Sequence, residues 1–140
     1  MQGEKIMTFE ELNIVRKLKK QIADETKKLQ ALKIVIGAFP HKYGKQNQGG
    51  SSGGVAKSDF ESFVVQIADA EKKIENLQAE LTDAVPRLTK KIQENFSDFA
   101  EQTLLIYRYV ACKSFKEISF LLGYSEQWIY KKHKELLKSL

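Results

Sequence analysis

The chain has 140 residues, and its 23 Lys and Arg residues against 18 Asp and Glu residues give a formal net charge of +5. This length fits one or two small domains, and a content of 42% hydrophobic and 29% charged residues is ordinary for a folded protein. The composition therefore excludes collagen-like, disulfide-knotted and wholly disordered chains.

The first predicted element is a long helix within residues 1–36. Thr8 and Glu11 have the spacing of a capping box, in which each side chain accepts a hydrogen bond from the backbone amide of the other residue, so the helix should start there. Behind them a heptad repeat runs to the end of the segment, with Glu25 as its one polar member. The repeat consists of Val15, Leu18, Ile22, Glu25, Leu29, Leu32 and Ile36.

Residues 37–57 are predicted to form a flexible linker. Gly37, Pro40 and Gly44 stop the first helix. The tract KQNQGGSSGG that follows has no side chains able to build a core, because it consists of glycine and polar residues. The linker is long enough to return the chain along the first helix, so an antiparallel hairpin is sterically allowed.

Residues 58–96 form the second predicted coiled-coil helix, which Ser58 and Glu61 open as another capping box. Pro86 lacks an amide donor, so it either kinks this helix or sits in the first turn of a following one, and a bend near Pro86 is expected. The heptad repeat of this segment is more regular than the first. It consists of Phe60, Phe63, Ile67, Ala70, Ile74, Leu77, Leu81, Ala84 and Leu88.

The two long segments carry opposite charge. Residues 8–36 hold seven basic and four acidic residues, whereas residues 58–85 hold two basic and seven acidic ones. Together with the two heptad repeats, this complementarity predicts a long antiparallel helical hairpin, a coiled coil. A hairpin of two helices leaves part of its apolar seam exposed, so we expect a second copy of the chain or the C-terminal region to cover it.

Residues 97–140 predict a C-terminal module of three short helices, which completes an all-α fold. Ser97 precedes the acidic start of the first short helix, Ser114 begins a third capping box, and Ser125 caps the last helix. Gly123, between the last two helices, can adopt the left-handed conformation that a sharp turn requires. A short helix, a glycine turn and a longer basic helix are typical of a helix-turn-helix.

The apolar spacing of the last helix leaves a polar, basic face outward, which suits a DNA groove. Gln can read adenine through two hydrogen bonds, Lys binds guanine acceptors or phosphates, and Tyr adds a hydroxyl that can bond a phosphate. Lys113 and Lys116 flank the start of the preceding short helix, where amides and positive charge favour a phosphate. The outward residues of the last helix are Glu126, Gln127, Tyr130, Lys131, Lys134 and Lys138.

These features also have plainer interpretations. Lysines on the solvent side of a terminal helix are usually only hydrated, and helix-turn-helix patterns give many false positives. We expect Trp128 to pack against the neighbouring helix rather than to contact a base. Lys132 lies on the inner side, where its stem should cover apolar surface, and we expect His133 beside it to be hydrogen-bonded or partly exposed rather than a metal ligand.

Several stretches of the C-terminal segment together match a known pattern. They are residues 108–110 (RYV), 115–118 (FKEI), 122–125 (LGYS) and 128–130 (WIY), followed by His133. The segment resembles the sigma-like helix-turn-helix of small phage-encoded regulators of Gram-positive bacteria, the ArpU/RinA-like late-operon regulators. The upstream layout, two long helices with a Ser/Gly-rich connector between them, is similar as well.

The resemblance implies promoter DNA binding, with the last helix in the major groove as in region four of bacterial sigma factors, and contact with RNA polymerase. Regions two and three of sigma factors have no counterpart in a chain of this length, so a complete sigma factor is not expected. Lys132 stands where relatives often carry an apolar residue, and Lys113 replaces a frequent Gly. The residues that the resemblance places against the groove are Ser125, Glu126, Gln127, Tyr130, Lys131 and Lys134.

No catalytic, metal or cofactor site is predicted. Metal-ligand spacing is absent, His41 lies in a predicted loop, and the GGSSGG tract lacks the Lys-Ser/Thr ending of a phosphate-binding loop. Cys112, the single cysteine, cannot form an internal disulfide, and we expect it to be a buried small apolar side chain. No apolar stretch approaches the roughly 20 residues of a membrane helix, and the first residues are unlike a signal peptide, so we expect a cytoplasmic protein outside membranes.

The leading hypothesis is a sequence-specific regulator of transcription that binds double-stranded DNA and derives from a phage. Its coiled coil would set the oligomeric state or bind a protein partner. One alternative is a DNA-packaging component resembling a small terminase subunit, in which the long helices assemble a ring. Another is a coiled-coil adaptor that binds a regulator and not DNA. An enzyme is not expected.

Overall fold

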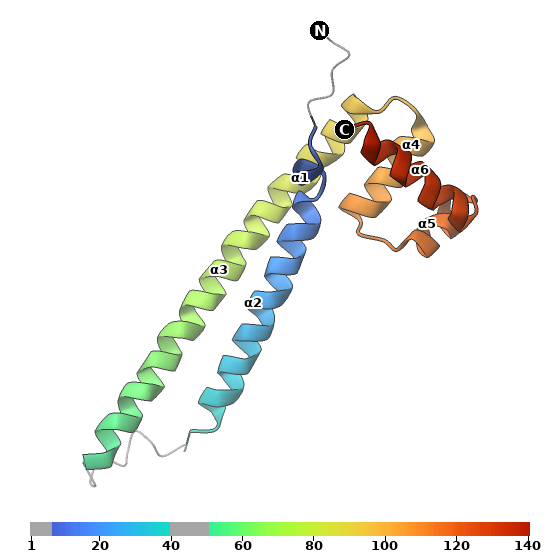
Figure 1. The fold of residues 1–140 in the computed structure, drawn as a ribbon. Helices are drawn as coiled ribbons and strands as arrows, with labels where there is room; N and C mark the ends of the chain where they lie inside the picture. The colour runs from blue at the N-terminus through green and yellow to red at the C-terminus, as the bar shows by residue number, and fades with distance from the viewer. Residues whose placement is uncertain (1–6, 40–50) are drawn as a thin grey trace. The chain divides into compact units, whose positions relative to one another are not determined.

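The structure is a computed structural model that describes residues 7–39 and 51–140 (Figure 1) and, within 51–58, the backbone alone. The regular elements of these residues are helices and none is a strand, which confirms the all-α prediction. None of the described helices combines the length and the apolar content that crossing a membrane requires. The elements are α1 (Phe9–Leu12), α2 (Ile14–Gly37), α3 (Ser51–Asn95), α4 (Phe99–Leu105), the π-helix η2 (Ile106–Val110), α5 (Phe115–Leu122) and α6 (Glu126–Lys138).

The chain divides into two compact units, and both long helices pass from one unit into the other. The first unit combines Met1–Lys19 with Glu80–Leu140, and the second is Lys20–Ala79. The C-terminal helices therefore share a unit with the start of α2 and the end of α3.

In the second unit, α2 and α3 contact each other in antiparallel order. Glu25 of α2 pairs with Lys73 of α3 at 3.2 Å, and only 15% of the Glu25 side chain is exposed. Farther along the chain, the ring of Phe39 contacts the rings of Phe60 and Phe63, with centroid distances of 5.5 and 6.1 Å. The ion pair explains why the heptad repeat of α2 accepts a carboxylate, since the charge is compensated where it is desolvated.

The heptad positions of both segments face inward. All of their apolar members are buried or half-buried, including Leu32 and Leu77, each 9% exposed. Side chains between these positions are mostly exposed, as the 3.6-residue period of a helix requires. The repeats therefore identify the buried face of each long helix.

The boundaries of the predicted linker differ from the structure at both ends. Ala38 and Phe39 continue from α2 as a hydrogen-bonded turn, and α3 begins at Ser51, before the predicted start at Ser58. Ser58 thus lies inside a helix and does not cap it. The reason is that a helix once formed gains one hydrogen bond for each residue added, and residues 51–57 contain no proline to stop it. Residues 40–50 of the predicted linker lie outside the described residues.

Pro86 lies within α3, so it does not begin a separate helix. Side chains bridge the turn around it. The Thr89 hydroxyl donates a hydrogen bond of 2.8 Å to the Val85 carbonyl, and Arg87 pairs with Asp83 at 2.8 Å. These local contacts stabilise the turn where proline removes a backbone donor.

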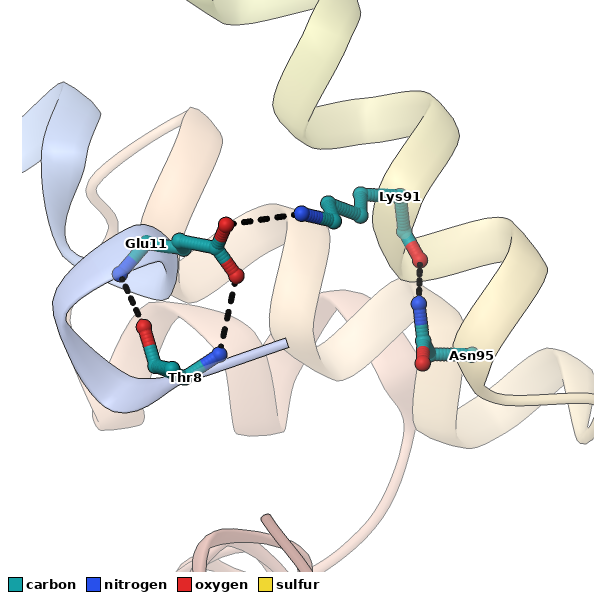
Figure 2. A network of polar contacts seen from close by, with 4 residues as sticks. All are labelled: Thr8, Glu11, Lys91 and Asn95. Atoms are coloured by element: carbon teal, nitrogen blue, oxygen red, sulfur yellow. Dashed lines mark hydrogen bonds and ion pairs between the residues drawn. The ribbon is translucent and has the colours of Figure 1, made fainter. Parts of the chain in front are cut away.

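In the first unit, Glu11 connects α1 to α3 (Figure 2). Its carboxylate accepts a hydrogen bond from the Thr8 amide at 2.9 Å, which confirms the predicted capping box, and pairs with the Lys91 ammonium at 2.7 Å. The backbone carbonyl of Lys91 in turn accepts a hydrogen bond from the Asn95 amide group. Two hydrogen bonds lower the pKa of Glu11 below its usual value. The one from Lys91 has the larger effect, and the one from the Thr8 backbone amide has the next largest.

The three C-terminal helices pack on one another (Figure 1), and a side chain caps the start of each. Ser114 and Ser125 cap α5 and α6 as predicted, whereas α4 is capped by Asp98 and not by Ser97. Asp98 prevails because its carboxylate reaches the amide of Glu101. Gly123 ends α5 with φ of 79°, the left-handed conformation expected for the turn. The buried residues of this packing include Leu104, Leu105, Tyr109, Ile118, Ile129 and Leu136.

We expect Glu11→Gln to reduce the free energy of unfolding by about 0.2–1 kcal/mol at pH 7, the range of partly exposed ion pairs. Because the pKa of Glu11 is lower in the folded state, its contribution is complete above the unfolded pKa and is lost as the pH falls through the folded pKa. The difference between wild type and variant should therefore shrink on acidification below about pH 4.3. Urea unfolding at pH 7 and pH 3 measures it.

Glu10→Gln provides the control, since Glu10 is exposed in the same helical turn and forms no ion pair within the part of the chain that the structure describes. It removes the same charge at nearly the same place. An equal loss in both variants would show that helix-end charge, rather than the Lys91 contact, stabilises this unit.

Candidate nucleic-acid interface

One face of α6 is buried and the other is open to solvent. Ile129, at 0% exposure, and Leu136, at 6%, are buried where α6 contacts α4 and α5. The predicted groove-facing residues of this segment all lie on the open side. They are Ser125, Glu126, Gln127, Tyr130, Lys131, Lys134 and Lys138, each exposed, while on α5 and the loop before it Lys116 is exposed and Lys113 half-buried.

Three lysines of the open face have no carboxylate partner within ion-pair distance in the described part of the chain. Among the described residues, Lys131, Lys134 and Lys138 form no ion pair. Their ammonium groups are therefore available to an anion. The spacing of Lys131, Lys134 and Lys138 places them on successive turns of one helix side.

Lys132 points the other way and fixes α6 to α4. Its ammonium pairs with Glu101 at 3.0 Å and lies 3.9 Å from Glu135. The hydrogen bond with Glu101 raises the pKa of Lys132. The predicted inward position of Lys132 is thus correct, and its charged group ends on a carboxylate of the neighbouring helix.

Aromatic stacking holds the turn between α5 and α6. Trp128 stacks on Tyr124 with ring centroids 4.0 Å apart and an angle of 17° between the planes. The interpretation of Trp128 as a packing residue therefore holds, although its partner belongs to the turn and not to a neighbouring helix. The Ser125 hydroxyl accepts a hydrogen bond from the backbone amide of Trp128. Gln127 lies in the same first turn, and its side chain is exposed.

Cys112 is exposed, which corrects the prediction of a buried side chain. It lies in the turn that connects η2 to α5, and its φ of 58° is in the left-handed region. The prediction rested on the apolar character of a lone cysteine, but the chain leaves the helix at Ala111, whose amide donates a π-type hydrogen bond to the Ile106 carbonyl. The turn places Cys112 on the outside of the fold.

A cluster of aromatic and basic side chains borders the open face of α6, and sequence reasoning missed it. The Tyr109 hydroxyl lies 2.6 Å from His133 Nε2, and the two rings stack with centroids 5.6 Å apart. The ring of Phe115 contacts His133 at 4.9 Å and Tyr130 at 4.6 Å. We call this group the His133 cluster; it consists of Arg16, Arg108, Tyr109, Phe115, Tyr130 and His133.

Burial controls the ionisation of this cluster. It lowers the pKa of His133, and the positive charges of Arg108 and Arg16 lower it further. Burial also raises the pKa of the Tyr109 hydroxyl. His133 is therefore neutral near pH 7, and a neutral imidazole nitrogen can accept a hydrogen bond from the Tyr109 hydroxyl. The prediction that His133 is hydrogen-bonded is confirmed.

We expect stability to decrease as the pH falls below about 6.5, because unfolded chains then protonate His133 while the folded state resists protonation. His133→Gln should flatten this pH dependence and cost about 1–3 kcal/mol, since the Tyr109 hydroxyl is buried and loses its ring partner. Urea unfolding between pH 5 and 7.5 measures both effects.

His41→Gln, which removes the other histidine of the chain, measures how much of the pH dependence comes from that residue instead of from His133. An NMR titration of the His133 ring gives an independent check. A pKa at or above 6.5 would contradict the assignment of a buried neutral imidazole.

Within residues 7–39 and 51–140, no group of three or more His, Cys, Asp or Glu residues is placed to hold a metal ion. Comparison of the chain with protein-family models, curated proteins and solved structures finds no match. The function is therefore argued from the α6 face and its surroundings.

Proposed function

We propose that this chain is a sequence-specific regulator of transcription that binds double-stranded DNA in the major groove. In this proposal α5, the turn at Gly123 and α6 act as a helix-turn-helix, with α6 as the recognition helix. The observation that supports it is the open face of α6, where three lysines stand without carboxylate partners among the described residues. Phosphates are the anions that such a face fits best.

The start of α6 carries the groups suited to reading bases. Gln127 is exposed and can bond adenine through two hydrogen bonds, and the Glu126 carboxylate can accept from the amino group of cytosine. Tyr130, 54% exposed, lies one turn farther along. Lys131 and Lys134 follow on the same side, where they would bind phosphates or guanine. Specificity would thus come from the first turn of α6 and affinity from its lysines.

In the same proposal, α2 and α3 act as an antiparallel coiled coil that sets the oligomeric state or binds a protein partner such as RNA polymerase. Two observations support this role. Glu25 of α2 forms an ion pair with Lys73 of the antiparallel helix α3, and the heptad positions of both helices face inward. The resemblance of the C-terminal segment to regulators encoded by phages suggests a phage origin and a place in the cytoplasm, beside bacterial DNA.

Replacing Lys131 and Lys134 together with alanine should weaken binding to duplex DNA and reduce its dependence on salt. Each phosphate contact contributes about −0.9 to the slope of log affinity against log salt concentration, so the double variant should lose up to about 1.8 of that slope. Fluorescence anisotropy with a labelled DNA fragment at several salt concentrations measures it. Alanine is the best helix former, so α6 should remain folded.

The double variant Lys27→Ala, Lys28→Ala is the matched control. Both lysines are exposed on α2 and form no ion pair inside the described segments, so the change in net charge is the same. If both double variants lose affinity equally, the effect comes from net charge and the α6 assignment is wrong. If the wild-type protein does not bind DNA even at low salt, the result would favour the alternative of a coiled-coil adaptor that binds a regulator and not DNA.

A further inference from the structure

Two arginines of the His133 cluster have no acidic partner among residues 7–39 and 51–140. The ion pairs of the described residues involve lysines and Arg87, but neither Arg16 nor Arg108. Both guanidinium groups lie over neutral aromatic rings instead. The Arg16 guanidinium carbon lies 5.8 Å from the ring centroid of Tyr109, and that of Arg108 lies 4.0 Å from the centroid of Phe115.

Arg108 is fixed in position while its charge stays uncompensated. Its Nη1 donates a hydrogen bond of 3.1 Å to the Lys113 carbonyl, and its Nε is buried without a hydrogen-bond partner. Both guanidinium groups lie over rings that contact His133, Arg108 over Phe115 and Arg16 over Tyr109. Burial lowers the pKa of Arg108, and the positive charge of Arg16 lowers it further. A half-buried cation beside a second cation is costly unless an anion compensates the charge.

The two arginines adjoin the face assigned to DNA. Arg108 covers the ring of Phe115, and Phe115 contacts Tyr130, which lies on the open side of α6. Arg16 is exposed on the first turns of α2, in the same compact unit. Arg108 therefore borders the open face of α6 through Phe115, and Arg16 lies over the Tyr109 ring of the same cluster.

We propose that Arg16 and Arg108 form a binding site for a backbone phosphate of DNA, so that α2 contributes a DNA contact beside the helix-turn-helix. This inference rests on the proposed function and adds to it a residue far from the recognition helix in sequence. Guanidinium groups suit the site because each can offer two parallel donors to phosphate oxygens. The contact positions the protein on the duplex and carries no base specificity.

The first test compares Arg16→Gln with Lys17→Gln. Both residues are exposed neighbours on α2, and each substitution removes one positive charge. In anisotropy measurements, Arg16→Gln should lower the slope of log affinity against log salt by about 0.9, whereas Lys17→Gln should leave it unchanged. Equal slopes for wild type and Arg16→Gln, with wild type still binding DNA, would overturn the phosphate site and leave the proposed function intact.

The second test detects the site without DNA. Sulfate keeps its double charge across the pH range of histidine titration and substitutes for the phosphate. An anion bound by the two arginines should offset their repulsion of the His133 imidazolium, so sulfate should raise the His133 pKa in NMR titrations, relative to chloride at equal ionic strength. The rise should disappear in Arg16→Gln and in Arg108→Lys, which keeps the charge but loses the fork of donors.

The outcomes separate the two proposals. If wild type fails to bind DNA but sulfate shifts the His133 pKa through Arg16, the anion site stands and the DNA-binding function is wrong. If sulfate leaves the His133 pKa unchanged and Arg16→Gln keeps the wild-type salt slope, the anion site is wrong.

Discussion

The rotation of α6 about its own axis is the constraint on which the candidate interface depends. Two adjacent polar residues fix this rotation. Lys132 forms an ion pair with Glu101 of α4, and His133 is hydrogen-bonded to the hydroxyl of Tyr109. Successive residues of a helix are about 100° apart, so side chains flanking this pair must point away from the core. A small change in this rotation would carry Lys131 or Lys134 toward α4 and remove the basic face.

Local sequence signals predicted much of the fold, because each reports an interaction between near neighbours. The capping boxes at Thr8 and Ser114, the glycine turn at Gly123 and the heptad spacing all appear in the structure. The same locality explains the errors. Ser58 has the spacing of a cap but lies inside α3, because cap spacing alone cannot show whether the helix has already begun upstream.

The His133 cluster could not be predicted, because it joins residues from α2, η2, α5 and α6 that only the tertiary fold brings together. One signal was available: a tyrosine placed in the core needs a partner for its hydroxyl, and His133 is the one histidine of the C-terminal segment. No comparable signal exists for Arg16, whose sequence position on α2 resembles that of any solvated helix residue. The π-helix that carries Arg108 and Tyr109 was equally hidden, since no residue preference marks it.

Gly123 shows how a single backbone angle can limit the evolution of this module. A Cβ built at that position meets no atom within 4 Å, so a larger residue there would not collide with its surroundings. The cost of replacement lies in the φ of 79° alone, about 1–2 kcal/mol for an ordinary L-residue. Asparagine tolerates this conformation better than other non-glycine residues, so homologous chains with the same bend should carry Gly or Asn here and hardly ever a β-branched residue.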